Sequence, residues 1–159
     1  MITLAIARHA KSEAPRAGLD DHDRPLTERG RRDAAAMAAR LADRGFRPAR
    51  VVSSTALRAR TTAEHFAAAL DTPLELDGDL YGAPATRLLA AAAASGLRAV
   101  LVVAHDPGMT VLADRLSGGG IGHMPTCAVA TFVWDTDDWD VGTAIDPVDW
   151  AVETPGDLS

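Results

Sequence analysis

Residues 3–12 read TLAIARHAKS, and this stretch decides the fold of the chain. Its first half is apolar and carries β-branched side chains, which is typical of a short strand buried inside a sheet. The run ends in Arg8 and His9, placed side by side where the sequence turns polar. In an open parallel sheet, ligands bind at the carboxyl ends of the strands, so this pair is expected at the mouth of a site. The alternative is a histidine packed at a strand end beside a surface arginine.

A second stretch repeats this arrangement. Residues 99–108 read AVLVVAHDPG, an apolar strand that ends in His105 and runs into a turn. The chain contains only five histidines, so two of them at strand ends indicate one site that two strands supply. His9 and His105 are therefore the first candidates for chemistry.

Strands and helices alternate along the rest of the chain. Further strands are predicted at residues 50–54, 73–76, 99–105, 126–134 and 148–152, and helices at residues 27–44, 56–70, 84–95 and 107–116. This alternation indicates an α/β fold in three layers, with a mostly parallel central sheet and helices on both faces. The last two strands are expected to form an edge ribbon, joined by an acidic turn at residues 135–140 and packed by Trp134, Trp139 and Trp150. Residues 117–122 contain four glycines and are expected to form a flexible loop.

The first helix has clear start and stop signals. Thr27 offers a hydroxyl that can cap its first turn, and Gly45 is a typical stop. Met37, Ala38 and Leu41 have the spacing of a buried helical stripe.

Arg58 falls in the first turn of the helix predicted at residues 56–70. A helix start carries partial positive charge, so an arginine there has the wrong sign. The arrangement makes sense if the arginine and the helix start share a bound phosphate. Arg60, two positions later, is expected to face solvent.

Residues 13–23 are polar and read as a loop in which His22 stands among Asp20, Asp21 and Asp23. These side chains resemble a set of metal ligands, but adjacent loop residues rarely converge on one ion. The alternative is a solvated segment whose acids orient arginines. The prediction is therefore that the chain needs no metal and no other cofactor.

Composition limits the classes of function. The chain has 159 residues, of which 47% are hydrophobic and 24% charged, as in an ordinary globular protein. This length predicts a single domain over residues 1–159, with a loosely ordered C-terminal tail at about residues 153–159. The net charge of −6 argues against a nucleic-acid partner, because a phosphate backbone requires a broad basic surface.

Location and redox chemistry are constrained as well. Met1 leads directly into the first strand without a charged leader or cleavage site, and no apolar stretch is long enough to cross a bilayer. A cytoplasmic location without a membrane partner is expected. Cys127 is the only cysteine, so an intramolecular disulfide is excluded, and we favour a buried small apolar role over a redox-sensitive thiol.

Four short motifs together resemble the histidine phosphatase superfamily, whose fold is called phosphoglycerate-mutase-like. They are RHA at residues 8–10, RPLT at 24–27, SSTALRARTTA at 53–63 and VAHDP at 103–107. The RPLT segment ahead of the first helix resembles the short SixA-type phosphohistidine phosphatases, and the similarity spans about residues 2–134. One departure is visible, because the family usually has glycine after the Arg-His pair and this chain has Ala10.

The resemblance implies a phosphatase that uses no metal and forms a covalent phosphohistidine on His9. It implies that Arg8, Arg58 and His105 complete the catalytic set, and the SixA-type branch adds Arg24 as a phosphate ligand. The chemistry of the residues agrees, because arginine stays cationic and its planar fork can bind two phosphate oxygens at once.

The two histidines are expected to act in different ways. A neutral His9 can attack phosphorus if a backbone carbonyl holds its other ring nitrogen as a donor. His105 is expected to bind the same phosphoryl group as a protonated, cationic ring. Lys11 is expected to join the arginines on this face.

The leaving group decides between substrates. A phosphate ester needs an acid for its leaving alkoxide, and Asp79, or alternatively Asp77, is the candidate. Phosphohistidine has a labile P–N bond that can do without one. The short segment between Leu70 and Ala99 leaves no room for a large lid, so an open site can accept a histidine on another protein. We therefore predict action on protein phosphohistidine, with a small-molecule phosphomonoesterase or mutase as the alternative and a non-catalytic phosphate-binding module as a third interpretation.

Overall fold

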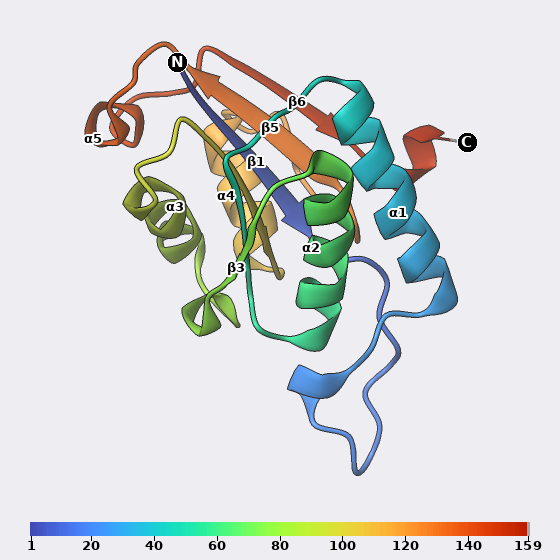
Figure 1. Cartoon of the computed structure of the whole chain (residues 1–159). Coiled ribbons are helices and arrows are strands. Elements are labelled where there is room, and N and C mark those ends of the chain that lie inside the picture. Colours follow the sequence, from blue (N-terminus) through green and yellow to red (C-terminus); the bar gives the residue numbers. More distant parts are fainter. Residues whose placement is uncertain (159) are drawn as a thin grey trace.

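The computed structural model describes residues 1–158, which form one six-stranded sheet with the strand order β3-β2-β4-β1-β5-β6 (Figure 1). Strands β1, β2, β3 and β4 run parallel, whereas β5 and β6 are antiparallel to their neighbours. The strands are β1 Ile2–Arg8, β2 Arg50–Ser53, β3 Leu74–Leu76, β4 Ala99–Ala104, β5 Val129–Trp134 and β6 Asp149–Glu153. The predicted mostly parallel sheet with an antiparallel edge ribbon is confirmed.

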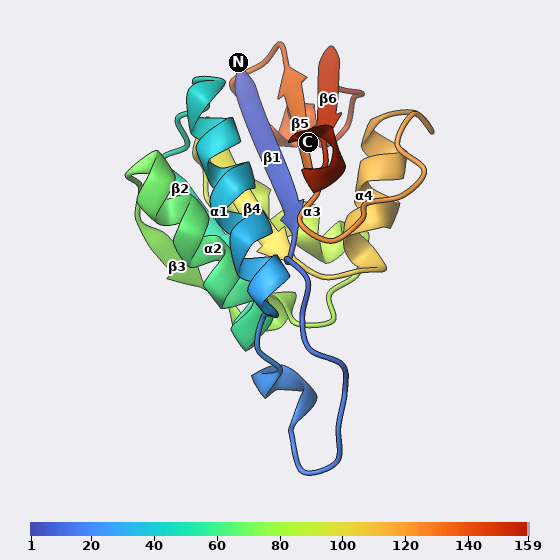
Figure 2. The same cartoon turned by 90° about the vertical axis from the view of Figure 1, so that its right-hand side faces the viewer.

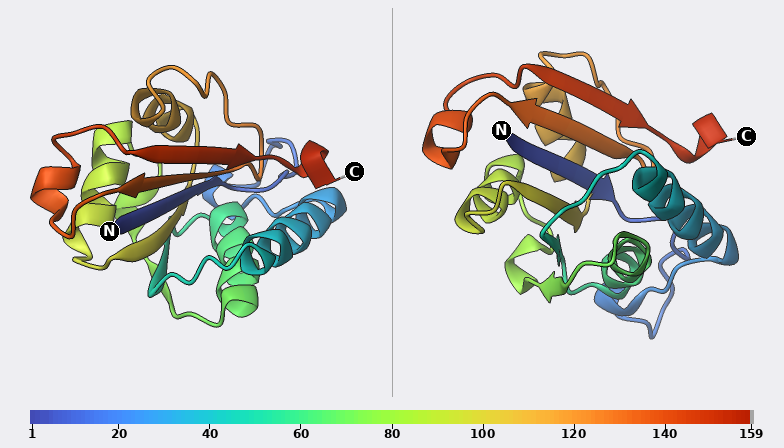
Figure 3. Two further views of the ribbon diagram at one scale, coloured as in Figure 1. Left: turned by 90° about the horizontal axis from the view of Figure 1, so that it is seen from above. Right: turned by 45° about the horizontal axis from the view of Figure 1, so that its top comes forward.

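Helices cover both faces of the sheet (Figures 1 and 3). They are α1 Glu28–Asp43, α2 Leu57–Leu70, α3 Ala85–Ala94, α4 Gly108–Leu116 and α5 Trp139–Gly142, with short 3-10 turns η1 Asp21–Asp23, η2 Gly78–Leu80 and η3 Pro155–Leu158. Helices α1 and α2 pack on one face, and α3 and α4 pack on the other. The predicted three-layer α/β fold is confirmed.

Strand β1 separates two hydrophobic cores. Its larger side chains, Ile2, Leu4 and Ile6, are buried on the face toward α3 and α4. Ala5 and Ala7 are buried on the opposite face, where the helices supply larger groups. Burial on both faces explains why the run is continuously apolar rather than alternating.

Helix α1 begins and ends where its sequence signals predict. The Thr27 hydroxyl accepts from Gly30 N–H at 3.0 Å, and Gly45 adopts φ +83° after the last turn. Gly30 also lies against the chain that leaves β1, because a Cβ at this position would come within 2.0 Å of the Lys11 carbonyl oxygen. The start of α1 is thereby fixed close to the carboxyl end of β1.

Two local predictions need correction. Strand β5 begins at Val129 rather than residue 126, because Cys127 adopts φ +62° and its N–H is directed at the carbonyls of Arg8 and His9, at 3.1 and 3.0 Å. The acidic turn at residues 135–140 contains the start of α5, whose first turn is capped by Asp138. The turn at Cys127 depends on contacts with a distant segment, whereas the cap of α5 is local, since the Asp138 side chain accepts from Asp140 N–H.

The tryptophans pack the edge ribbon as predicted, though with unequal burial. Trp134 and Trp139 are buried with ring centroids 6.1 Å apart, and the Trp139 indole donates to Leu97 O at 2.8 Å. Trp150 is 38% exposed and lies over Gly120, where a Cβ would come within 2.4 Å of its ring. The glycine-rich loop therefore leaves room for this indole.

The C-terminal segment, predicted as a loose tail, continues β6 through Glu153 and then forms η3 at Pro155–Leu158. Ser159 lies outside the described residues. Within residues 1–158, no helix combines the length and apolar character needed to cross a membrane.

Candidate active site

A cavity of about 590 Å³ lies at the carboxyl ends of β1 and β4. The segment between β1 and α1 projects beyond this end of the sheet and supplies much of its wall (Figure 2). The structure brings together here every basic residue that the sequence predicts for the site. The cavity is lined by Arg8, His9, Lys11, Ser12, Glu13, Ala14, Pro15, Arg24, Thr27, Arg58, His105, Asp106 and Thr126.

His9 is held in one tautomer by the backbone. Its Nδ1 lies 2.7 Å from Ala10 O, and because a carbonyl only accepts, Nδ1 carries the proton. None of the residues 1–158 hydrogen-bonds the other ring nitrogen, Nε2, which keeps its lone pair. Burial, with the charges of Arg58 and Arg8, lowers the pKa of His9 to about 4. The ring is therefore neutral at pH 7.

Ala10, which stands where the resemblance leads one to expect glycine, fits the site without loss of backbone packing. It is completely buried, and its N–H donates to Thr62 Oγ1 at 3.0 Å. The His9 N–H donates to Ala104 O at 3.0 Å, so the backbone beneath the imidazole is fixed by both α2 and β4.

His105 faces His9 from the end of β4, with ring centroids 5.2 Å apart. A cationic His105 was expected on a bound phosphoryl group; in the free protein the ring is neutral at pH 7. Burial lowers the pKa of His105 to about 3, and the adjacent His9 and Arg58 charges act in the same direction. The positive charge of the free cavity at pH 7 therefore comes from its arginines and Lys11.

Three buried side-chain atoms in the described part of the chain have no hydrogen-bond partner, and all three belong to this cavity. They are Arg8 Nε, Arg58 Nε and His105 Nδ1. Buried polar atoms are normally satisfied, so such a group indicates a missing ligand. Two of the three are permanent donors on cations, which points to an anion.

The guanidinium groups are held through their remaining nitrogens. Arg8 Nη1 donates to Met124 O at 3.0 Å and lies 3.4 Å from Asp106 Oδ2. Arg58 Nη1 and Nη2 donate to Asp21 O and Oδ2, at 2.7 and 3.1 Å. Fixed guanidinium groups lose less entropy when they bind an anion.

Asp21 joins several walls of the cavity. Besides Arg58, its carboxylate accepts from Arg24 Nε at 2.9 Å and from the Tyr81 hydroxyl. The Tyr81 hydrogen bond and those from the two arginines hold the pKa of Asp21 well below its usual range. The interpretation of the loop acids as groups that orient arginines is confirmed for Asp21. Within residues 1–158, no cluster of three or more His, Cys, Asp or Glu side chains is arranged to hold a metal ion.

Comparison with known proteins gives the family. Residues 4–81 match the model of the histidine phosphatase superfamily (branch 1). An uncharacterized Mycobacterium tuberculosis protein is 40% identical over 114 residues, which cover 69% of each chain. The chain belongs to the histidine phosphatase superfamily. The resemblance seen in the four motifs is confirmed.

Solved structures place this phosphatase beside the SixA type. The protein histidine phosphatase SixA in complex with tungstate superposes with a TM-score of 0.80 and 25% identity, over 99% of this chain and 100% of that one. A protein of Agrobacterium tumefaciens assigned as the phosphohistidine phosphatase SixA gives a TM-score of 0.78 and 26% identity, over 95% and 94% of the two chains. The phosphoglycerate-mutase-like fold is confirmed, and the protein is a phosphatase by class.

The carboxylates predicted as a general acid lie elsewhere in this phosphatase. Asp79 is ion-paired with Arg87 at 2.6 Å, and Asp77 Oδ1 accepts from Asp79 N–H at 2.9 Å. Neither residue lines the cavity. The cavity's own carboxylates are Glu13, whose Oε2 lies 3.2 Å from Arg16, and Asp106.

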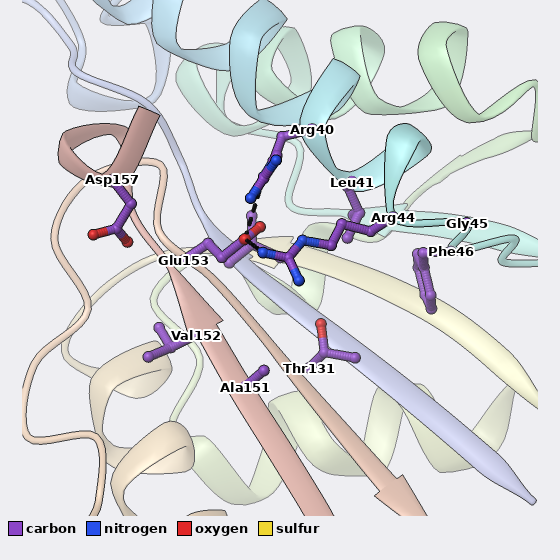
Figure 4. Close-up of a pocket in the computed structure, with 11 residues that line it drawn as sticks. Arg40, Leu41, Arg44, Gly45, Phe46, Thr131, Ala151, Val152, Glu153 and Asp157 are labelled. Atoms are coloured by element: carbon purple, nitrogen blue, oxygen red, sulfur yellow. Dashed lines mark hydrogen bonds and ion pairs between the residues drawn. The ribbon is translucent and has the colours of Figure 1, made fainter. Parts of the chain in front are cut away.

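A second cavity, of about 640 Å³, lies between the end of α1 and strands β5 and β6 (Figure 4). Its arginines, Arg40 and Arg44, both bind the Glu153 carboxylate. None of the unpartnered buried atoms found in residues 1–158 lies there. The groups suited to phosphate therefore gather in the cavity of His9 and not in this one.

Sequence reasoning missed several residues of the site. Asp106 directly follows His105, Ser54 follows a predicted strand, and Tyr81 follows the short segment after the next strand. These positions near strand ends were a signal that the three side chains could reach the site. Their partners lie far away in the sequence. Cys127 is buried, and burial raises the pKa of its thiol to about 12, in agreement with an apolar packing role.

Proposed function

We propose that this phosphatase hydrolyses phosphohistidine on proteins, without a metal, through a covalent phosphohistidine on His9. The observation that carries the proposal is the state of His9. A neutral imidazole with a free Nε2 lone pair lies in the same cavity as the unpartnered donors of Arg8 and Arg58. Residues 1–159 are proposed to form a single domain with this activity.

The proposed reaction has two displacements. Arg8, Arg24 and Arg58 bind the oxygens of the phosphoryl group, and the Nε2 lone pair of His9 attacks phosphorus. The P–N bond of the substrate breaks, and its electron pair leaves with the substrate ring, which departs as neutral imidazole because its other nitrogen carries a proton taken up from solvent. Water then attacks phosphorus, the P–Nε2 bond breaks, and its electron pair returns to His9, while the proton of the water passes to solvent. Phosphoryl transfer needs mainly positioning and charge stabilisation, which the arginines supply.

Phosphohistidine is favoured as the substrate because the leaving imidazole requires no dedicated acid. The carboxylates that line the cavity are held by other groups, Glu13 by Arg16 and Asp106 by Arg8. Within residues 1–158, no residue of β3, η2 or α3 lines the cavity, which supports a site open to a protein surface. The SixA proteins that resemble this chain are named as phosphohistidine phosphatases.

A small-molecule phosphomonoesterase or mutase is the second candidate. The cavity volume of about 590 Å³ favours it, because small-molecule sites have volumes of about 300–1,000 Å³. A non-catalytic phosphate-binding module is a weaker alternative, since it gives no reason for a free Nε2 on His9.

Rapid-quench labelling tests the proposal. A protein carrying ³²P-phosphohistidine is mixed with the enzyme and quenched in alkali, with excess chelator in a parallel series. We expect transient label on the wild type, with or without chelator, and on the control His65→Ala, whose half-buried ring lies on α2 outside the cavity. His9→Ala should carry no label. Label on His9→Ala, or turnover abolished by the chelator, would overturn the mechanism.

Substrate competition separates the two candidates. We expect faster turnover of the phosphohistidine protein than of sugar phosphates, and less than a twofold effect of Asp79→Asn on it. Preferred turnover of a sugar phosphate, with a large loss in Asp79→Asn, would instead support the phosphomonoesterase.

A further inference from the structure

Ser54 connects three parts of the site. It follows β2, is completely buried, and donates its backbone N–H to Val103 O at 3.0 Å, next to the end of β4. Its hydroxyl oxygen accepts from Ala56 N–H at 3.2 Å, where α2 begins. The same oxygen lies 2.8 Å from His105 Nε2. One hydroxyl therefore joins β2, the start of α2 and the second histidine.

The hydroxyl proton of Ser54 has one acceptor in the described part of the chain. Ser54 is out of contact with solvent, and its oxygen already receives the Ala56 N–H. His105 Nε2 is the remaining atom within hydrogen-bond distance. If Nε2 carried the ring proton, the Ser54 O–H and the His105 Nδ1 lone pair would both be left unpaired. If Nδ1 carries the proton, the Ser54 O–H donates to Nε2 and only the Nδ1–H is left without a partner. Because unpaired buried polar groups cost free energy, the second arrangement is favoured.

We propose that Ser54 is a positioning residue, which donates its hydroxyl proton to His105 Nε2 and so holds the ring as the neutral Nδ1–H tautomer. The ring then offers Nδ1–H to the phosphoryl group as a hydrogen-bond donor without having to be charged. The inference rests on the proposed function for the identity of the anion, but the tautomer is a property of the free protein. The low pKa of His105 agrees with a ring that acts as a neutral donor.

The tautomer can be read directly by long-range ¹H–¹⁵N NMR of the histidine rings in the free enzyme at pH 7. We expect the His105 signals of an Nδ1–H tautomer in the wild type and a shift toward Nε2–H in Ser54→Ala. The matched control is Ser53→Ala, which removes a neighbouring buried hydroxyl whose hydrogen bond goes to Ser54 O and not to His105. An Nε2–H tautomer in the wild type, or no change in Ser54→Ala, would overturn the inference even if the phosphatase activity is established.

Binding and kinetics test what the tautomer does. With tungstate as a phosphate mimic, we expect Ser54→Ala to weaken binding by about 10-fold, the loss of one hydrogen bond to a charged group. Ser53→Ala should stay within twofold. In a His105→Ala background, Ser54→Ala should have no further effect on tungstate binding or on kcat/KM. Equal losses with and without His105 would show a merely structural role and overturn the proposal. If the wild type has the Nδ1–H tautomer but does not hydrolyse the phosphohistidine protein, the result would count against the proposed function instead.

Discussion

At the scale of single residues, the cavity pairs fixed cations with neutral imidazoles. Arg58 contributes its Nη1 and Nη2 to Asp21 and keeps Nε unpaired, so its fork is already oriented. In the free protein His9 and His105 carry no charge at neutral pH, because burial and the neighbouring cations lower their pKa values to about 4 and 3. The arginines therefore supply the fixed positive charge of the cavity, which the proposed function assigns to the phosphoryl group.

Arg58→Lys should lower kcat/KM by about 100-fold or more, because lysine keeps the charge but loses the planar fork. The measurement is steady-state turnover of a phosphohistidine protein. Arg60→Lys is the matched control, since Arg60 is exposed on the same helix and outside the cavity. Comparable losses of kcat/KM in both variants would show that a disturbed α2, and not the missing guanidinium of Arg58, lowers the activity.

NMR titration of the histidine rings should find His9 neutral throughout the range from pH 5.5 to 8, with a midpoint near pH 4. An ordinary histidine titrates near pH 6.5. A His9 midpoint above pH 6 would contradict the neutral state that the proposed nucleophile requires. The ring signals are assigned by their loss in His9→Gln.

At the scale of elements, the segment between β1 and α1 contacts the rest of the site through one short turn, η1. Asp21 of η1 binds Arg24, Arg58 and Tyr81, so this turn ties a loop to the start of α2 and to the segment after β3. The start of α1 is fixed against Lys11 by the absence of a side chain at Gly30. The projecting segment is thereby anchored at both of its ends.

Asp21→Asn should lower kcat/KM by about 10-fold, because Arg24 and Arg58 each lose a charge-assisted hydrogen bond that orients them. Asp23→Asn is the control, since Asp23 lies on the same turn and, within residues 1–158, its one charged partner is His22 at 3.8 Å. Activity that is unchanged or higher in Asp21→Asn would mean that the carboxylate competes with substrate and does not position the arginines.

At the scale of the whole molecule, the buried histidines couple folding to pH. Their pKa values lie below the ordinary value of about 6.5, so the unfolded chain binds more protons under acid conditions. Their contribution to stability is complete above pH 6.5 and is lost as the pH falls toward 4 and 3. The free energy of unfolding should fall by on the order of 3 kcal/mol between pH 6.5 and 5. Urea unfolding at the two pH values measures it, and a flat response that matches a His9→Asn/His105→Asn variant would contradict this coupling.

Much of the fold follows from local sequence, but the site follows only in part. The apolar runs that end at Arg8 and Ala104, and the Thr27 and Gly45 signals, correspond to elements at the predicted places. The roles of Asp21 and Ser54 could not be predicted, because each depends on partners that the fold brings from other segments. The neutral state of His105 in the free protein could not be predicted either, since the sequence does not reveal how deeply a ring is buried.

The turn at Cys127 has a consequence for how this enzyme can be inhibited. The backbone N–H of Cys127 is directed at the carbonyls of Arg8 and His9, at the end of β1 and just before β5 begins. The thiol is buried, and because its pKa is raised to about 12 it stays protonated. Alkylating reagents attack the thiolate. Native enzyme treated with iodoacetamide should therefore keep its full turnover and show no added mass, whereas denatured enzyme should gain one adduct, for the sole cysteine in the chain. Turnover through the chemistry proposed for His9 would then be insensitive to electrophiles that inactivate thiol-dependent enzymes.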